Sequence, residues 1–504
     1  MIRQSRWDEE ADVVVVGYGG AGAVTAITAH DAGSRVIIIE KQPCDTPTWI
    51  RHTPSTRMSA GAWLCPTSLD KAILYMEGIA RIANETLDAE RKNIISIFAQ
   101  HLVGNTDWMK KIGVQIGGEE ASSTGGIPFA DFPEIPGSDC SVIYTPKVTG
   151  NYRNGAALFK ALAEAVQKRN IPVLWEAPTR HLITQRGEVR GVIASMGGKE
   201  TRIKARRAVV LTCGGFEHNE GMKENYLRAN PTHFLANPGN TGDGINMAIE
   251  VGAALWHMNS ASWRGTMKFP DFPIAFGTQR HETASIFTDK RGRRFTNERV
   301  RIHAFGYELT NYDSSSLCYP KIPFYWVFDE KRRALAPLAN PNGACNPPGG
   351  IMSDIHYIWS TDNKKEIDRG WILKANSIEE LAGKILADPD NGGLMSPSVL
   401  RETVKQYNEY CHKGDDTEFH KPKEWLQPLE DPPYYAVKLW PGGPNTQGGP
   451  KRNVRGQILR VDNTPIHRLY SAGELGSVWG MFYQGAGNIA ECIAFGRISG
   501  TNAA

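Results

Sequence analysis

Residues 12–40 read DVVVVGYGGAGAVTAITAHDAGSRVIIIE, and this stretch decides the fold class. Residues 13–16 are four consecutive valines, a run too short for a helix and typical of a buried parallel strand. Residues 23–32 have the composition of a helix that stops at Gly33, and residues 36–39 form a second apolar strand. The order predicts a strand–helix–strand unit at the start of a doubly wound parallel sheet.

A Gly-x-Gly-x-x-Gly pattern, formed by Gly17, Gly19 and Gly22, joins the first strand to the helix. The first glycine makes a tight turn, the second lets backbone approach a pyrophosphate, and the third lets the helix pack closely. The helix N-terminus favours phosphate charge, and Glu40 can accept hydrogen bonds from ribose hydroxyls. Such glycines also occur in ordinary turns, but the complete order predicts a dinucleotide site. It leaves NAD and FAD both open.

A second glycine-rich loop, GNTGDG at residues 239–244, leads into a predicted helix at residues 245–251. It is a candidate for further phosphate or ribose contacts. The alternative is an ordinary helix entry, because a carboxylate such as Asp243 is favourable in a first turn.

Composition excludes several classes of protein. The 57 Lys and Arg residues against 54 Asp and Glu give a net charge of +3, too balanced for a nucleic-acid binder. No stretch is long and apolar enough to span a bilayer, so we expect no transmembrane segment. The eight cysteines form no Cys-x-x-Cys pair, which argues against disulfide frameworks, metal centres and haem attachment. A reducing cytoplasm is the expected location.

Ten further motifs, in a fixed order, carry a family resemblance. They are VVVVGYGGAGA (13–23) with Glu40, TRMSAGA (56–62), TCGGFEHN (212–219), NTGDGINMA (240–248), GRRFTNE (292–298), PPYYAV (432–437), TQGG (446–449), LYSAGE (469–474), YQGAGN (483–488) and FGRISG (495–500). From about residue 11 to 500 the chain resembles the fumarate reductase and succinate dehydrogenase flavoprotein superfamily, also called FAD-dependent oxidoreductase 2. In motif it is most similar to the soluble 3-ketosteroid dehydrogenases.

The resemblance implies an α/β fold, with a doubly wound Rossmann-type FAD-binding domain and an inserted α+β substrate, or cap, domain. We expect the FAD-binding domain at residues 1–275 and 429–504, and the cap at residues 276–428. The implied FAD-binding residues are Gly17, Gly19, Gly20, Ala21, Gly22, Glu40, Lys41, Ser59, Ala60, Gly61, Gly214, Asn240, Thr241, Asp243, Gly473, Glu474, Asn488 and Ile489.

Noncovalent FAD is expected. Arg51-His52-Thr53 is similar to the His-Thr to which membrane-bound members attach FAD. Its spacing to Ser59 is longer here and better matches soluble members, so covalent attachment is the less favoured alternative.

The resemblance also implies the chemistry. Such enzymes move a hydride between flavin N5 and a carbon near a carbonyl or carboxylate, while another group moves a proton. In the ketosteroid dehydrogenase pattern, the Tyr483 hydroxyl and the Gly487 amide would bind the ketone oxygen. Packing of Tyr483 on the flavin is the alternative.

The acid or base is not decided by the motifs. Ile302 stands at the expected spacing, so a one-residue shift would place Arg301 or His303 there, although surface roles fit both equally. Tyr144 and Tyr325 are further candidates for the substrate pocket, and core packing is the competing interpretation. Weaker candidates of the same kind are Trp108, Tyr319 and His257.

The favoured function is desaturation of a cyclic ketone beside its carbonyl, because Asn445 replaces the histidine that precedes Thr446 in the fumarate-type motif. The alternative is an ene-reductase of an unsaturated acid or enone, with Arg301 as proton donor. A non-catalytic flavin-binding protein is a minor alternative. The expected partners are a cyclic ketone or unsaturated acid and an external electron acceptor or donor, with no nucleic acid. The oligomeric state stays open.

Overall fold

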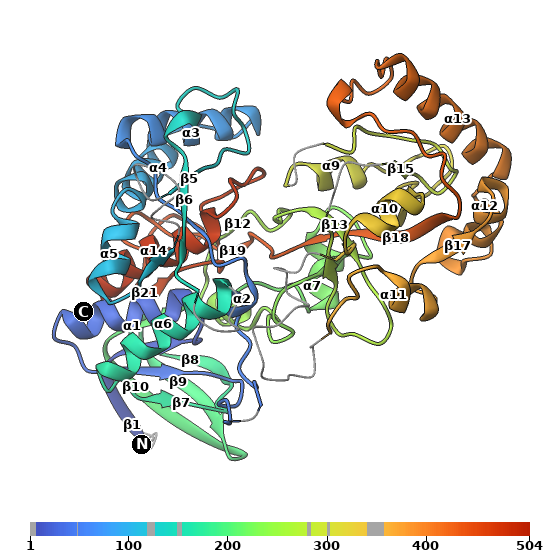
Figure 1. Cartoon of the computed structure of the whole chain (residues 1–504). Helices are drawn as coiled ribbons and strands as arrows, with labels where there is room; N and C mark the ends of the chain where they lie inside the picture. The colour runs from blue at the N-terminus through green and yellow to red at the C-terminus, as the bar shows by residue number, and fades with distance from the viewer. Residues whose placement is uncertain are drawn as a thin grey trace.

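A computed structural model describes residues 7–47, 49–117, 126–148, 154–279, 284–299, 303–339 and 357–504. Two large sheets form the two lobes seen in Figure 1, and the chain starts and ends in the same lobe. The long strand β18 (Tyr434–Gly443) belongs to the second lobe, and the chain returns from it to the first.

The first sheet has eight strands, with β20-β21-β10-β1-β2-β7 as its main path and β8 and β9 attached through β10. Its strands are β1 (Glu9–Val16), β2 (Val36–Ile39), β7 (Val173–Leu174), β8 (Thr179–Gln185), β9 (Glu188–Met196), β10 (Lys199–Leu211), β20 (Gln457–Leu459) and β21 (Pro465–Ser471). β1 pairs in parallel with both β2 and β10, as the predicted strand–helix–strand unit requires. The doubly wound α/β fold is confirmed.

Both faces of this sheet are covered, which explains the unbroken valine run. Val13 and Val15 enter one hydrophobic core, together with α1 (Gly20–Asp31), while Val14 and Val16 enter another. Alternating strand residues point to opposite faces, so a strand buried on both faces needs apolar residues throughout. The helices around the first core also include α3 (Leu69–Ile82), α4 (Ala89–Leu102), α5 (Asn105–Lys111), α6 (Asn154–Lys168) and α14 (Gly487–Ala503).

The second sheet has seven strands, with the path β14-β13-β18-β16-β15 and with β11 and β17 on β18. They are β11 (His233–Phe234), β13 (Arg264–Met267), β14 (Phe276–Gly277), β15 (Ser285–Thr288), β16 (Phe324–Phe328), β17 (Leu373–Ala375) and β18. The helices of this lobe are α9 (Phe305–Leu309), α10 (Glu330–Leu335), α11 (Lys364–Asp368), α12 (Ile378–Leu386) and α13 (Pro397–Lys413). Since β11, β13 and β18 lie outside residues 276–428, this sheet extends beyond the expected cap on both sides. The division of the chain at those residues stays a proposal.

Smaller elements complete the fold. A four-stranded sheet contains β3 (Trp63–Leu64), β4 (Ile116–Gly117), β5 (Ile127–Pro128) and β6 (Val142–Pro146), and β12 (Leu255–Trp256) pairs with β19 (Gly449–Pro450). The remaining helices are α2 (Ser55–Met58), α7 (Glu220–Tyr226) and α8 (Asp243–Glu250), with short 3-10 turns at Ser138–Cys140, Pro389–Asn391 and Lys423–Trp425. None of the helices in the described part of the chain is long and apolar enough to cross a membrane.

Candidate functional site

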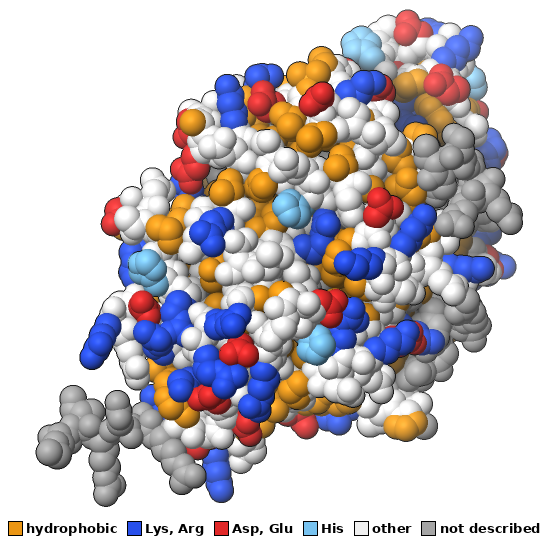
Figure 2. Space-filling view, turned by 90° about the vertical axis from the view of Figure 1, so that its left-hand side faces the viewer, with side chains coloured by type: hydrophobic (Ala, Val, Ile, Leu, Met, Phe, Trp, Pro, Cys, Tyr) orange, Lys and Arg blue, Asp and Glu red, His pale blue; other side chains and the backbone are white. Residues whose placement is uncertain are grey.

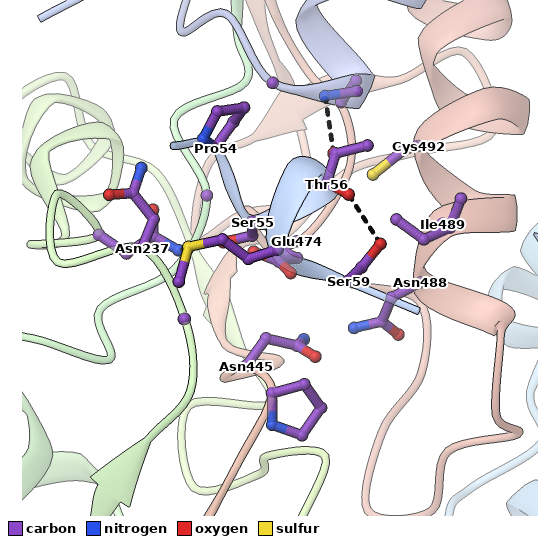
Figure 3. Close-up of a pocket in the computed structure, with 18 of the residues that line it drawn as sticks. Pro54, Ser55, Thr56, Ser59, Asn237, Asn445, Glu474, Asn488, Ile489 and Cys492 are labelled. Carbon is purple, nitrogen blue, oxygen red and sulfur yellow. Dashed lines mark hydrogen bonds between the residues drawn. The ribbon is translucent and has the colours of Figure 1, made fainter. Parts of the chain in front are cut away.

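One cavity of about 370 Å³ collects residues from both ends of the chain. Figure 3 shows Ser55 and Thr56 from the N-terminal region beside Glu474 and Asn488 from the C-terminal region. Fifteen of the expected FAD-binding residues line it: Gly17, Gly19, Gly20, Ala21, Glu40, Lys41, Ser59, Ala60, Gly61, Gly214, Asn240, Asp243, Glu474, Asn488 and Ile489. The structure therefore brings most of the predicted set together around one space.

Gly22 and Gly473 stand behind the cavity wall, where they permit close packing. A Cβ on Gly22 would lie 2.0 Å from the Gly17 carbonyl oxygen. A Cβ on Gly473, which has φ +76°, would lie 2.8 Å from the Ala21 side chain. Both positions need glycine because a side chain would not fit there. Neither glycine lines the cavity, and each allows the backbone around the cavity to pack closely.

The N-terminus of α1 forms one end of the cavity. The Gly20 amide donates to the Thr56 hydroxyl oxygen at 2.9 Å, so α2 sits over the start of α1. Thr56, the first residue of the TRMSAGA motif, and its neighbour Ser55 line the cavity, although neither is among the expected FAD-binding residues. Helix N-terminal amides together with two hydroxyls suit a pyrophosphate.

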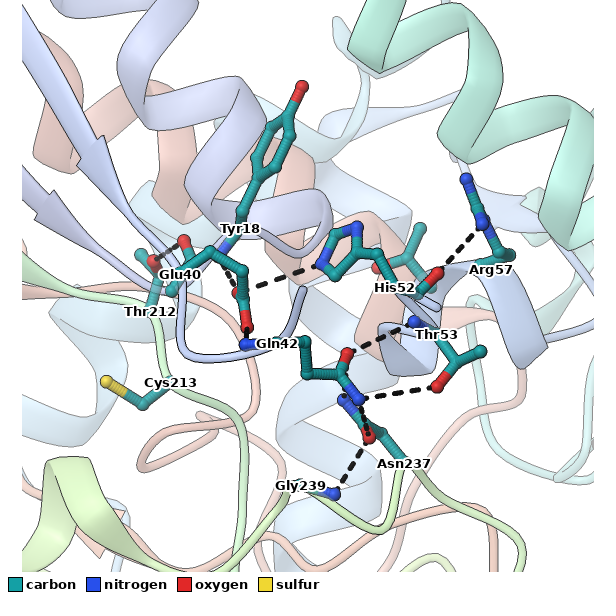
Figure 4. A network of polar contacts seen from close by, with 12 residues as sticks. Tyr18, Glu40, Gln42, His52, Thr53, Arg57, Thr212, Cys213, Asn237 and Gly239 are labelled. Atoms are coloured by element: carbon teal, nitrogen blue, oxygen red, sulfur yellow. Dashed lines mark hydrogen bonds and ion pairs between the residues drawn. The ribbon is translucent and has the colours of Figure 1, made fainter. Parts of the chain in front are cut away.

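Glu40 directly follows β2, and its carboxylate accepts from the Tyr18 amide at 2.8 Å and the Gln42 amide at 2.7 Å (Figure 4). Burial acts to raise its pKa, but the contact with His52 and these two amides outweigh burial and hold the pKa below its ordinary value. Glu40 is therefore ionised and has the acceptor oxygens that ribose hydroxyls need.

Lys41 joins two loops that are far apart in sequence. Its Nζ lies 2.9 Å from Thr241 Oγ1 and 2.7 Å from Asp243 Oδ2. Thr241 itself does not line the cavity, and its hydroxyl bonds Asp243 Oδ1 at 2.9 Å. The second glycine-rich loop is thus tied, at the cavity edge, to the segment that follows β2.

His52 is stacked on Tyr18, with ring centroids 5.5 Å apart, and is enclosed by Phe159 and Trp175. Its side chain is buried and does not line the cavity. This placement gives no support to covalent attachment of a flavin at His52 and agrees with noncovalent FAD.

At the other part of the cavity, four polar side chains meet: Tyr483, His303, Arg264 and Asp131. The Tyr483 and His303 rings lie edge to face, with centroids 4.7 Å apart. The Asn488 amide, in the first turn of α14, donates to the Tyr483 hydroxyl at 3.5 Å. Burial is the largest effect on Tyr483 and raises its pKa well above the ordinary value, so the phenol is neutral and can donate a hydrogen bond.

The expected role of the Gly487 amide does not fit this structure. That amide donates to the Gln484 carbonyl at 2.9 Å, and Gly487 does not line the cavity. The preceding Ala486 has φ +64°, which turns the chain tightly into α14 and directs the Gly487 amide back into the turn. Gly485 and Ala486 line the cavity in its place.

Two expected pocket residues lie elsewhere. Tyr325 is buried in the core between the second sheet and helices α12 and α13, because its position on β16 points away from the cavity. Tyr144 and its strand neighbour Ile143 both pack against the first core, and of these two only Ile143 lines the cavity. Arg301, like Ile302, lies outside the described residues.

The weaker candidates have structural places. Trp108 packs against the first core, and the Tyr319 hydroxyl donates to the Arg228 carbonyl at 3.3 Å. His257 Nδ1 bonds the Ser477 carbonyl at 2.8 Å, and burial lowers the pKa of His257 to about 3. None of the three lines the cavity.

Arg264 and Asp131 were missed. Arg264 stands in the apolar segment 263–267, and a charged residue inside an apolar strand is a signal that could have been used. Asp131 lies in the stretch where the family resemblance is weakest, and nothing in the sequence marks it.

The family model described as FAD binding domain matches residues 12–489. The chain belongs to this family. The ionised Glu40, the glycines and the α1 N-terminus fit FAD, which is the cofactor.

Two relatives and one solved structure illustrate the range of the family. The 3-oxosteroid 1-dehydrogenase of Mycobacterium tuberculosis is 28% identical, over 97% of this chain and 98% of that protein. The fumarate reductase (cytochrome) of Shewanella frigidimarina is 26% identical, over 98% of this chain and 77% of that protein. The 3-ketosteroid delta1-dehydrogenase from Sterolibacterium denitrificans, solved with 1,4-androstadiene-3,17-dione, superposes with a TM-score of 0.81 at 21% identity, over 98% of this chain and 99% of that one. This chain is an FAD-dependent oxidoreductase of the class that acts on CH–CH bonds.

Proposed function

We propose that the enzyme dehydrogenates a cyclic ketone at the carbon–carbon bond next to the carbonyl. One observation carries the proposal: a neutral phenol, Tyr483, stands on the cavity wall in edge-to-face contact with His303. The pair offers a hydrogen-bond donor for a ketone oxygen beside a group that can take a proton. The similarity to the 3-oxosteroid 1-dehydrogenase supports a ketone substrate.

Bound FAD supplies the hydride acceptor, and the chain's own residues do the rest. Tyr483 donates its hydroxyl to the ketone oxygen, which makes the C–H bonds beside the carbonyl more acidic. His303 accepts the proton from that carbon. Apolar side chains on the same cavity, Met58, Phe129 and Leu235, hold the ring system and keep water away.

A second candidate is reduction of an unsaturated acid, which the similarity to the fumarate reductase also suggests. The half-buried cation Arg264 on the same wall favours it, since a guanidinium suits a substrate carboxylate. In both reactions an external acceptor or donor must exchange electrons with the flavin. The described cysteines are all free thiols, and we propose a cytoplasmic location on that basis.

An anaerobic titration of the holoenzyme separates the two. Cyclic ketones are expected to bleach the flavin absorbance. Bleaching by succinate-like acids alone would exclude a cyclic ketone as the substrate. Tyr483→Phe is expected to lower turnover by about 10²-fold or more with FAD retained. Tyr312→Phe, at a surface tyrosine that is 51% exposed, is the matched control.

A further inference from the structure

Arg264 is the unexplained charge of the cavity. It opens β13 and lies opposite Gly442 of β18, next to the cavity residues Pro444 and Asn445. The residue is half-buried and its Nε is fully buried, with no hydrogen-bond partner among the described residues. The Arg264 guanidinium also forms no ion pair with any residue that the structure describes.

The surroundings of Arg264 do not neutralise it. Burial lowers its pKa, and the nearby Tyr483 and Asp131 act in the opposite direction. Tyr483 is neutral, and Asp131, whose Oδ2 accepts from the Gly485 amide at 2.5 Å, acts on Arg264 through its charge but forms no direct ion pair with it among the described residues. An arginine stays protonated under such conditions, so a positive charge faces the cavity.

A partly buried cation without a directly paired anion is costly to the folded protein, and such groups collect at functional sites. The guanidinium is therefore available to a negative charge that develops on the ligand. During the proposed reaction, the proton lost to His303 leaves its electron pair on the substrate, and the charge moves to the carbonyl oxygen as an enolate. That oxygen is the atom to which Tyr483 donates.

We propose that Arg264 is a catalytic residue that stabilises the enolate oxygen together with Tyr483, in the place that the family resemblance gave to the Gly487 amide. The proposal rests on the proposed function. Two observations carry it: Arg264 and Tyr483 line the same cavity, and the Gly487 amide is bonded to Gln484. A preformed cation gains most from charge that develops in the transition state, because it needs no reorganisation.

A phenol probe tests Arg264 without turnover. 4-Fluorophenol resembles an enol, and the ¹⁹F shift of the bound probe reports whether it is phenol or phenolate. We expect the holoenzyme to lower the pKa of the bound probe relative to water. Arg264→Gln should raise that pKa by about one unit or more, a tenfold change in phenolate preference, and Arg264→Lys should restore part of the effect.

Kinetics give the second readout. Arg264→Gln should lower kcat about 10²-fold or more for ketones while KM changes little. Arg202→Gln is the matched control, because Arg202 also has a buried unpartnered Nε but lies on β10, away from the cavity lining. Flavin absorbance and thermal unfolding check that each variant is folded and loaded.

An unchanged probe pKa in Arg264→Gln overturns the proposal. So does a variant in which KM rises for substrates with a carboxylate while kcat is unchanged, because Arg264 is then an anchor for that carboxylate. These outcomes differ from failure of the proposed function, which is seen as absence of flavin bleaching by any cyclic ketone.

Discussion

The His303 and Tyr483 rings meet at an interplanar angle of 73°, so one ring presents its edge to the face of the other. His303 comes from the segment before α9 and Tyr483 from the loop before α14. That loop is held from several sides. The Tyr75 hydroxyl donates to Gln484 Oε1 at 2.6 Å, and the Tyr307 hydroxyl donates to the Met481 carbonyl at 2.5 Å. The contact between His303, the proposed proton acceptor, and Tyr483, the proposed hydrogen-bond donor, therefore forms where the second lobe meets the first.

His303→Gln is expected to lower kcat by about 10²- to 10⁴-fold, since a general base contributes that much. It should also remove the acid limb of the pH–kcat profile, because glutamine does not titrate. Steady-state rates from pH 5 to 9 measure both. His412→Gln, at a surface histidine, is the control, and a His303→Gln enzyme with an unchanged pH profile would assign the proton to another group.

The Lys41–Asp243 ion pair is expected to support FAD affinity, because it ties the second glycine-rich loop to the segment that follows β2. Asp243→Asn removes the ion pair at 2.7 Å and should raise the FAD Kd roughly fivefold to tenfold, as expected for about 1 kcal/mol of a half-buried pair. Fluorescence titration of apoprotein with FAD measures it. Asp431→Asn breaks a similar surface pair with Lys331 and should leave the Kd unchanged. Equal changes of the FAD Kd in Asp243→Asn and Asp431→Asn would contradict a role of the Lys41–Asp243 pair in FAD binding.

Gly22→Ala is expected to damage the FAD site through space alone. The added Cβ would meet the Gly17 carbonyl oxygen at 2.0 Å, so the loop must shift, at a cost of about 1–3 kcal/mol in unfolding free energy and more than tenfold in FAD Kd. Gly383→Ala is the matched control. Gly383 lies inside α12 with open space around it, so alanine there should leave FAD binding unchanged and stabilise by about 0.5–1 kcal/mol. Normal FAD affinity in Gly22→Ala would refute the packing argument.

Part of the proposed cofactor site could be predicted from the sequence because that part is local. Gly17, Gly19 and Glu40 lie within one strand–helix–strand unit, and their spacing follows from its geometry. The substrate side depends on contacts between distant segments. Arg264 reaches the cavity through pairing of β13 with β18, and no local pattern encodes that pairing.

Two other expectations on the substrate side depend on similar non-local features. Tyr325 lies on β16, none of whose residues lines the cavity, and a strand buried on both sides gives no alternation from which its orientation could be predicted. The role expected of the Gly487 amide depends on the direction of one amide, which is set by the backbone turn at Ala486 and not by a sequence pattern. His303 was found, but only by allowing a shift of one residue in the family spacing.

A buried charge network holds the segment that precedes His303. Arg294 bonds Glu298 at 2.9 Å and Asp416 at 2.8 Å, and Lys421 Nζ lies 3.1 Å from Glu298. Burial acts to raise the pKa of both carboxyls, but Lys421 and Arg294 outweigh it for Glu298, and Arg294 outweighs it for Asp416. Both pKa values are therefore below their ordinary range.

This network predicts loss of stability in acid. An acid with a lowered folded pKa stabilises the protein fully above its ordinary pKa, 4.5 for Glu298, and the contribution is lost as the pH falls through the folded value. Glu298→Gln should cost about 3–5 kcal/mol at pH 7, because it leaves the buried Lys421 without its anion and Arg294 with Asp416 alone. It should also flatten the decline in unfolding free energy below pH 4.5, measured by urea unfolding between pH 7 and 3. Glu402→Gln, whose side chain is 64% exposed, should do neither. If the unfolding free energy of Glu298→Gln fell with pH below 4.5 as steeply as that of the parent protein, protonation of Glu298 would not account for the loss of stability in acid.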